Sequence, residues 1–297
     1  MRAAREPSVE QQIEQLAAEL APSPGERLTP RTLLAEVGFD SLAWADLALA
    51  VEERFGIRLG DTDVEEFRTL ADVARAVSSR PDRRLGLPRG IGRSVTGAKG
   101  VAGPVLRWWF HMRIAGTEHI PAEGPVVVAA NHRSMWDIPI LVVAFPRRVV
   151  FMAKRELYRN AFLNRLWLEL GGFPVRRGGA DLRAIDNALE VLDRGLALGI
   201  YPEGTRSFTG EMLPFLKGAA WLAVKTGASI VPCAITGSAR RARNGRGGRR
   251  GSTMRRPVTL TFGPPIPVEV EADPIRRRAE AEAVTARLLE SIISLLG

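Results

Sequence analysis

Hydrophobic and polar residues follow different periods in the two parts of the chain. In residues 8–80 the apolar positions recur every three or four residues, the period of amphipathic helices. Three segments show this pattern: residues 8–21, 41–55 and 70–77. From about residue 126, short apolar runs of strand length alternate with helical stripes, which is typical of a sheet covered by helices. The sequence therefore predicts a small all-α bundle followed by an α/β domain with a central, mostly parallel or mixed sheet.

Two apolar runs in the second part end at polar segments that carry candidate chemistry. Residues 126–130, Val-Val-Val-Ala-Ala, are predicted to be a buried strand and lead into Asn-His-Arg-Ser-Met-Trp-Asp at 131–137. Residues 196–200 lead in the same way into Tyr-Pro-Glu-Gly-Thr-Arg-Ser at 201–207. Strand ends are a usual place for reactive groups in α/β folds. Further along, an amphipathic helix is expected over 181–195, a strand over 258–262 and a helix from 273.

His132 and Asp137 are the candidate catalytic pair. Five positions on a regular helix would place their side chains about 140° apart. They can meet only if His132 lies in the turn before the helix begins. A histidine that a carboxylate orients can take a proton from an alcohol. The alternative is a surface histidine near a helix-capping carboxylate, and Ser134 is interpreted as a capping residue, not a nucleophile.

Three other segments complete a recognisable order: Lys-Arg-Glu-Leu at 154–157, Gly-Gly-Phe-Pro-Val-Arg at 171–176 and Ile-Val-Pro-Cys-Ala-Ile at 230–235. With N-H-x4-D and E-G-T-R-S, this set resembles the glycerolipid acyltransferase family, whose best-known members are 1-acylglycerol-3-phosphate O-acyltransferases. The resemblance covers roughly residues 104–265. It implies that His132 is the general base and Asp137 its orienter. It also implies an acceptor site for a glycerol phosphate, formed by Glu203, Gly204, Thr205, Arg206, Lys154 and Arg176. Each cation could instead be a solvated surface charge.

The first part of the chain carries a second motif, Gly-Phe-Asp-Ser-Leu at 38–42. It matches the phosphopantetheine attachment motif, and the segment resembles an acyl carrier protein. The resemblance implies a four-helix bundle, with 4'-phosphopantetheine on Ser41 and a phosphopantetheinyl transferase as a partner. Ser41 could instead be an ordinary helix N-cap. Trp44 is bulky and Asp46 short for the helix that a modifying enzyme reads, so a degenerate carrier that serves only for docking is the alternative.

The domain boundaries follow from these motifs and from composition. Residues 1–80 are assigned to the carrier-like domain and residues 104–297 to the acyltransferase domain. Between them, residues 81–103 are rich in Pro, Gly and Arg, without a sustained period, and are interpreted as a flexible basic linker. About 20 flexible residues reach roughly 25 Å. A tethered carrier would then act at about millimolar effective concentration.

The sign of the net charge changes at the same boundary, near residue 80. Residues 8–80 hold 14 acidic and 7 basic side chains, a net −7, whereas residues 81–297 hold 18 acidic and 33 basic ones, a net +15. A basic domain suits phosphate-bearing substrates or an anionic membrane. The Gly/Arg-rich residues 240–256 invite a nucleic-acid interpretation, but no aromatic residue interleaves them for stacking. We expect a mobile basic loop and no nucleic-acid partner.

Membrane contact is the other open question. Arg107 precedes Trp108 and Trp109, and such a group suits a bilayer interface; the same tryptophans could simply pack a helix onto the core. No apolar stretch approaches 18 residues, no signal peptide is evident, and a single cysteine, Cys233, fits a reducing compartment. We expect a cytoplasmic protein, peripherally associated with the cytoplasmic membrane, that needs no metal.

Three functions are compatible with the sequence. The first is an enzyme that moves a fatty acyl group from a thioester, on the carrier or on coenzyme A, to the hydroxyl of a lysophosphatidate-like lipid. The second keeps this chemistry but uses an acceptor without phosphate, such as a lyso-aminolipid or a glycolipid. The third is a carrier-fused lipid-binding protein without turnover.

Overall fold

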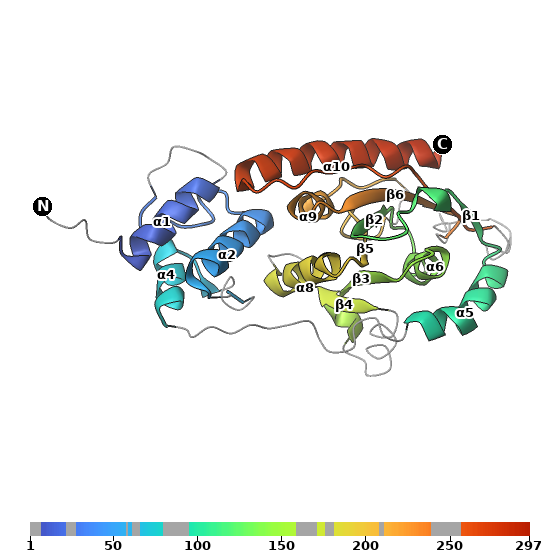
Figure 1. The fold of residues 1–297 in the computed structure, drawn as a ribbon, viewed down its shortest axis with the longest axis horizontal. Coiled ribbons are helices and arrows are strands. Elements are labelled where there is room, and N and C mark those ends of the chain that lie inside the picture. Colours follow the sequence, from blue (N-terminus) through green and yellow to red (C-terminus); the bar gives the residue numbers. More distant parts are fainter. Residues whose placement is uncertain are drawn as a thin grey trace, which may run out of the picture. The chain divides into compact units, whose positions relative to one another are not determined.

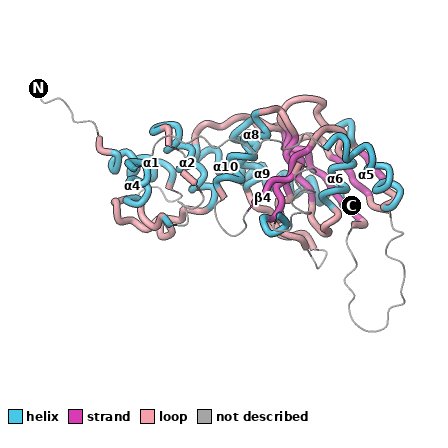
Figure 2. Tube along the Cα trace, turned by 90° about the horizontal axis from the view of Figure 1, so that it is seen from below, coloured by secondary structure: helices cyan, strands magenta, loops and turns pink. Residues whose placement is uncertain are grey.

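A computed structural model describes residues 7–21, 28–57, 59–60, 66–79, 95–158, 171–175, 181–207, 211–238 and 257–297. Arg176, most of the predicted linker and the basic segment 240–256 lie outside these ranges. The chain divides into two compact units. The first is built mainly of Met1–Gly86 and the second of Leu87–Val175, Asn187–Ala272 and Arg276–Gly297. In Figure 2 the helices labelled α1, α2 and α4 belong to the first unit, and the strands, drawn in magenta, belong to the second.

The described residues between 7 and 79 contribute three complete helices to the first unit: α1 (Val9–Leu20), α2 (Ser41–Phe55) and α4 (Leu70–Ser79). Local signals account for their ends. Ser8 and Gln11 form a capping box at the start of α1, and Gly56, at φ 67°, ends α2 in the left-handed region. These bounds agree with the predicted helical segments. The prediction of four helices stays a prediction, because residues 61–65 lie outside the described ranges.

The core of the bundle includes Trp44. Its ring lies 6.1 Å from that of Phe39, edge-on, and 6.5 Å from that of Phe67, and the side chain is only 8% exposed. An aromatic cluster of this kind contributes both buried area and edge contacts to stability. The bulk of Trp44 is therefore accommodated inside the bundle, which removes one of the two reasons for expecting weak docking of a modifying enzyme.

The second unit is organised around one mixed sheet with the strand order β1-β7-β6-β2-β5-β3-β4. All described strand pairs are parallel except β6 with β7, so the prediction of a mostly parallel or mixed sheet is confirmed. The strands are β1 (Arg113–Ala115), β2 (Val126–Ala130), β3 (Val149–Lys154), β4 (Gly172–Val175), β5 (Ala197–Ile200), β6 (Ser229–Thr236) and β7 (Thr259–Phe262).

Every residue of β2 is buried, because this central strand is covered on both faces. Right-handed crossovers between parallel strands require α6 (Asp137–Ala144) to lie on one face and α9 (Gly218–Thr226) on the other. Figure 1 shows this arrangement, with the second half of α8 (Leu182–Asp193) on the α9 side. The long helix α10 (Pro274–Leu296) and two short 3-10 helices, Thr117–His119 and Arg155–Tyr158, complete the unit.

Helix α5 (Val95–Trp109) begins inside the range that the sequence predicts as linker. The glycines in this stretch suggested a loop, but the helix runs through them and through Pro104. Gly103 lies against α6, where a Cβ would make an ordinary van der Waals contact with Val143 Cγ1 at 3.7 Å. Arg107 Nη2 also donates to Val143 O at 3.5 Å. Packing against α6 thus explains a helix that local composition argues against.

Candidate active site

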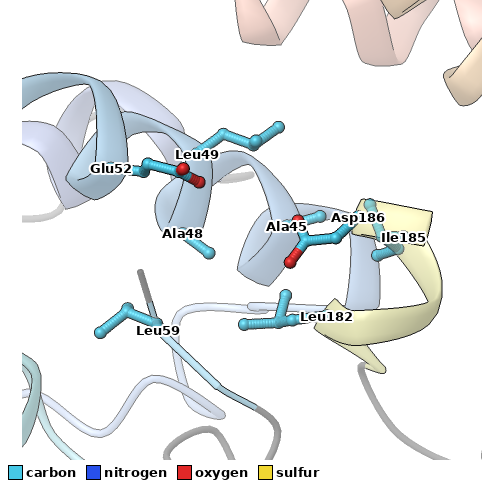
Figure 3. A pocket seen from close by; sticks show the side chains of 8 residues that line it. All are labelled: Ala45, Ala48, Leu49, Glu52, Leu59, Leu182, Ile185 and Asp186. Carbon is cyan, nitrogen blue, oxygen red and sulfur yellow. The ribbon is translucent and has the colours of Figure 1, made fainter. Parts of the chain in front are cut away.

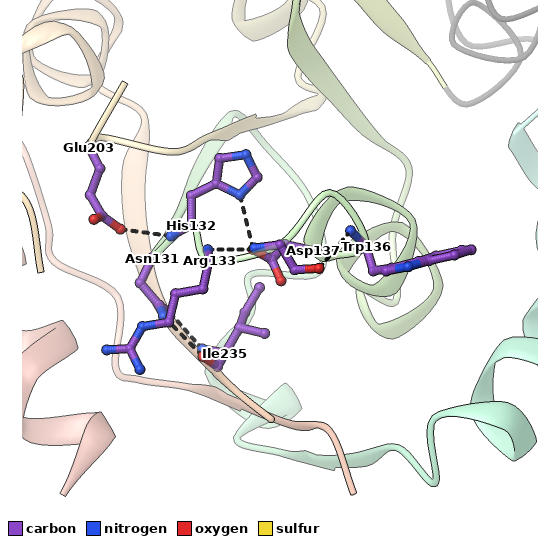
Figure 4. A network of polar contacts seen from close by, with 8 residues as sticks. Asn131, His132, Arg133, Trp136, Asp137, Glu203 and Ile235 are labelled. Atoms are coloured by element: carbon purple, nitrogen blue, oxygen red, sulfur yellow. Dashed lines mark hydrogen bonds and ion pairs between the residues drawn. The ribbon is translucent and has the colours of Figure 1, made fainter. Parts of the chain in front are cut away.

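His132 lies in the segment between the end of β2 and the start of α6. This is the turn in which the spacing argument required it to lie, and the structure confirms that placement. Its Nδ1 is 2.9 Å from Asp137 Oδ2, and both side chains are buried (Figure 4). An ionised carboxylate only accepts hydrogen bonds, so Nδ1 carries the proton and Nε2 is left as the acceptor.

Asp137 is the first residue of α6, and a single oxygen of its carboxylate holds the whole turn. Oδ2 accepts from the backbone N–H of Arg133 and of Ser134, each at 2.7 Å, in addition to the imidazole. A carboxylate at a helix N-terminus is further stabilised by the helix dipole. The Ser134 hydroxyl accepts from Trp136 N at 3.2 Å, which is a local turn contact. The interpretation of Ser134 as a capping residue is wrong, because the N-cap of α6 is Trp136 and no side chain caps this helix.

The E-G-T-R-S segment contacts the His132 turn through the backbone of His132. Glu203 Oε1 accepts from His132 N at 2.7 Å, and Ser207 N donates to His132 O at 2.9 Å. The other oxygen of Glu203 accepts from Leu213 N at 3.0 Å. Glu203 is 5% exposed, so both of its carboxylate oxygens serve the chain itself. Sequence spacing alone gave no sign of this contact between residues 71 positions apart.

Asn131 connects the same turn to the neighbouring strand β6. Its Nδ2 donates to Ile235 O at 2.9 Å, and its Oδ1 accepts from Ile235 N at 2.7 Å. The buried amide therefore takes the place of a backbone partner at the end of the β2–β6 ladder. His132 is thus held from both sides, by Asn131 through β6 and by Glu203 after β5.

The remaining acceptor-site candidates follow Glu203 in a tight turn. Gly204 N donates to Tyr201 O at 2.9 Å, and Gly204 has a φ of 66°, a region that disfavours side chains. A Cβ at this position would also lie 2.6 Å from Leu216 Cδ1. Thr205 is exposed and Arg206 half-buried. The backbone conformation therefore favours glycine at position 204, whereas the exposed Leu216 side chain could move to make room for a Cβ.

The sheet places the backbone of Lys154 at the same edge as the end of β2. Lys154 is the last residue of β3 and pairs in register with Val175, the last residue of β4, which directly precedes Arg176. The carboxyl ends of β2, β5, β3 and β4 lie along one edge, because these strands are parallel and adjacent. The side chain of Lys154 and all of Arg176 lie outside the described residues.

Two side chains near the His132–Asp137 pair were not identified as site residues from the sequence. Tyr201 stacks on the His132 ring, with centroids 4.1 Å apart. Cys233 on β6 is fully buried, and burial together with the Asp137 carboxylate raises the pKa of its thiol. An aromatic residue directly after an apolar strand was the only available signal for Tyr201. Among the described residues, no three His, Cys, Asp or Glu side chains gather in a way that could hold a metal ion.

Ser41 lies in the first unit at the start of α2. The N-cap is Asp40, whose Oδ1 accepts from Leu42 N at 3.0 Å and from Ala43 N at 2.8 Å. The alternative that Ser41 is the capping residue is therefore wrong. Ser41 is exposed as the first helical residue. By helical periodicity it shares the face of α2 that carries Ala45, Ala48 and Glu52, whose side chains Figure 3 shows. An exposed serine hydroxyl that is not needed for capping fits a site of covalent modification.

Comparison with known proteins matches each part of the chain to one family. Residues 111–236 match the family described as Acyltransferase, and residues 11–77 match the family described as Phosphopantetheine attachment site. The 1-acyl-sn-glycerol-3-phosphate acyltransferase of Borreliella burgdorferi is 34% identical over 124 residues, which are 41% of this chain and 50% of that protein. The protein of the same name from Bacillus subtilis is 32% identical over 127 residues, 42% of this chain and 63% of that protein.

A crystal structure of the 1-acyl-sn-glycerophosphate acyltransferase from Thermotoga maritima aligns with a TM-score of 0.49 and 28% identity over 66% of this chain and 78% of that chain. The chain spans about half the length of the curated relative from Borreliella burgdorferi and somewhat more of that from Bacillus subtilis. Residues 111–236 are thus similar to the acyltransferase family, and residues 11–77 are similar to the phosphopantetheine-attachment family.

Proposed function

We propose that the protein transfers a fatty acyl group from a thioester to the hydroxyl of a lysophosphatidate-like lipid, with His132 as general base. The observation that carries the proposal is the buried His132–Asp137 pair at the carboxyl ends of the parallel strands, with the E-G-T-R-S segment hydrogen-bonded to the same turn. Curated relatives of this domain are named for 1-acyl-sn-glycerol-3-phosphate acylation, which supports the choice of acceptor.

In the proposed reaction His132 Nε2 takes the proton of the acceptor hydroxyl as its oxygen attacks the thioester carbonyl. A new C–O bond forms, the C–S bond breaks, and the thiolate that leaves takes the proton from the imidazolium. Asp137 stabilises the imidazolium and holds the tautomer that the first step needs. No acyl-enzyme is required, because the thioester is already activated.

The oxyanion of the tetrahedral intermediate needs hydrogen-bond donors from elsewhere in the site. The backbone N–H groups of His132, Arg133 and Ser134 are engaged by Glu203 or Asp137. These three groups are therefore occupied in the resting structure. Donors outside the turn, or groups of the substrates, would have to serve this role.

We assign the acceptor phosphate to three basic residues: Lys154 at the end of β3, Arg206 in the segment after β5, and Arg176, which follows β4 in the sequence. A guanidinium can bind a phosphate through two hydrogen bonds, and Thr205 and Gly204 lie in the adjacent turn. Glu203 would act on the acceptor indirectly, because its oxygens hold the turns that flank the site.

Reversing the charge of Arg206 tests this choice of acceptor. We expect Arg206→Glu to lower kcat/KM for a lysophosphatidate by about 10²-fold, through loss of a charge-assisted contact and added repulsion. The loss for a matched lysolipid without phosphate should be less than about threefold. Arg287→Glu, at an exposed position on α10, is the control reversal. Equal losses with both acceptors would favour the alternative acyltransferase that uses a lyso-aminolipid or a glycolipid.

The first unit is proposed to deliver the acyl group. The structure fits 4'-phosphopantetheine at Ser41, because the hydroxyl is exposed and Asp40 caps the helix in its place. When attached by a phosphopantetheinyl transferase, this group supplies the thiol that carries an acyl thioester. Attraction between the acidic carrier, at −7, and the basic remainder, at +15, would favour repeated docking.

An exposed apolar surface beside the site supports a membrane partner. Phe110, after α5, contacts Trp136 of the His132 turn, with ring centroids 5.4 Å apart. The two segments that meet here carry large side chains that expose 46–71% of their surface, which we together name the aromatic face: Val105, Trp108, Trp109, Met135 and Trp136. Within the described residues, no helix combines the length and apolar character needed to cross a bilayer. We propose that the aromatic face and nearby arginines attach the domain to an anionic lipid surface.

Liposome flotation should show this attachment. Binding to anionic vesicles is expected to exceed binding to neutral vesicles and to weaken as salt rises, because surface charges are screened. Combined Trp108→Ala and Trp136→Ala should weaken binding by at least about tenfold through loss of interfacial aromatic rings. Ile293→Ala, which alters an apolar side chain 52% exposed on α10, should leave binding unchanged. Equal binding to both kinds of vesicle would remove the electrostatic part of the proposal.

A further inference from the structure

His132 belongs to a stack of three aromatic rings. Its imidazole lies nearly parallel to the Tyr201 ring, with centroids 4.1 Å apart and planes inclined by 23°. Behind Tyr201 comes Phe151, with centroids 6.2 Å apart and planes inclined by 20°. The sheet explains the order of the stack, because β5, which leads into Tyr201, lies between β2 and β3. The stack therefore extends from the candidate base into the core.

Gly199 anchors the inner end of the stack. A Cβ at this position would lie 2.1 Å from Phe151 Cε1, so the Phe151 ring occupies the space that any other residue would fill. Phe151 is 1% exposed and packs in the main hydrophobic core. Close packing of this kind leaves little room for the ring to tilt. Tyr201 thus rests on a rigid support.

We propose that Tyr201 is a positioning residue that holds the plane of the His132 ring and stabilises its protonated form; this inference rests on the proposed function of His132 as base. The hydrogen bond from Nδ1 to Asp137 holds one edge of the imidazole but leaves the ring free to turn about that bond. Face-to-face contact with Tyr201 removes this freedom and so determines where Nε2 points. When His132 takes the hydroxyl proton, the imidazolium lies over an aromatic face, which is a favourable cation–π contact.

The ring, and not the hydroxyl, carries this role. Tyr201 Oη is buried and has no hydrogen-bond partner among the described residues. Burial, and next the negative charge of Asp137, raise the pKa of the Tyr201 phenol, so it stays neutral and does not exchange protons with the site. An unpaired buried hydroxyl costs stability. Replacing Tyr201 by Phe keeps the stacked ring and removes only that hydroxyl, which makes it the matched control.

Steady-state kinetics of the full chain, with acyl-coenzyme A and a lysophosphatidate, separate ring from hydroxyl. Tyr201→Leu should lower kcat by about 10- to 30-fold while KM changes less than about threefold, because the contact is strongest after proton transfer. Tyr201→Phe should keep kcat within about threefold and unfold at the same or a higher temperature. If Tyr201→Leu does not fold, Phe151→Leu takes its place and should lower kcat by about three- to tenfold through loss of support.

Proton NMR of the imidazoles gives a readout that does not depend on activity. The chain has three histidines, and His132→Ala identifies the His132 signal by its loss. The ring current of Tyr201 should shift the His132 ring protons upfield in the wild type and in Tyr201→Phe, and Tyr201→Leu should abolish the shift. An unshifted signal in the wild type, or wild-type kcat in a folded Tyr201→Leu, would overturn the inference. Activity that survives in His132→Ala would overturn the proposed base itself, whatever the Tyr201 variants do.

Discussion

His132→Ala is expected to lower acyl transfer by at least about 10²- to 10⁴-fold, the contribution typical of a positioned general base. Among the described side chains, His132 is hydrogen-bonded to Asp137, and no other side chain bonded to Asp137 could replace His132 as the base. Asp137→Asn should keep the fold, since an amide oxygen can still accept from the N–H groups of Arg133 and Ser134. It should nevertheless lose most of the rate, because the neutral amide does not stabilise an imidazolium.

Steady-state turnover with acyl-coenzyme A and a lysophosphatidate provides the measurement. His111→Asn is the matched control, because His111 is exposed and has a φ of 45°, which Asn tolerates. It should retain wild-type turnover. Turnover of His132→Ala within tenfold of the wild type would contradict the assignment and would favour a lipid-binding protein without catalysis.

Ser41→Ala is expected to abolish transfer of acyl groups loaded on the chain's own carrier. Transfer from soluble acyl-coenzyme A should remain within about threefold of the wild type, because the substitution lies outside the unit that holds His132. Asp40 still caps α2, and alanine is a good helix former, so the bundle should fold normally. The carrier loses only the hydroxyl that takes the modification.

Intact protein mass after coexpression with a phosphopantetheinyl transferase provides the readout. The wild type should gain the mass of one 4'-phosphopantetheine and Ser41→Ala none, whereas Ser78→Ala, in the same unit, should behave as the wild type. A serine that stays unmodified beside a competent transferase would indicate a degenerate carrier. Carrier-loaded transfer that survives Ser41→Ala would indicate docking without delivery.

Much of the fold could be predicted from periodicity. The apolar run 126–130 coincides with β2, the stripe after Ser41 with α2, and the expected helix at 181–195 with α8 to within two residues at each end. These segments have strong, uninterrupted patterns. Helix α5 was not anticipated from residue 95, because its stability comes from packing on α6 and not from local propensity.

The His132–Asp137 pair could be predicted from the sequence for a geometric reason. Only a turn placement lets residues five apart meet, so His132 and Asp137 constrained each other's position. The contacts of His132 with Glu203 and Tyr201 could not be predicted from the sequence, because no local segment determines the order of the strands in the sheet. Adjacency of β2 and β5 creates both contacts. The capping role of Asp40 could not be predicted because Asp40 and the neighbouring Ser41 are both residue types that commonly cap helices.

Product analysis tests the central claim most directly. The purified full chain would be incubated with acyl-coenzyme A and a lysophosphatidate carrying a different acyl chain, and the lipids separated by mass. The proposed function predicts a diacyl glycerol phosphate that contains both chains, formed by the wild type and absent with His132→Ala. Hydrolysis of the thioester without this product, or equal product from His132→Ala, would contradict it.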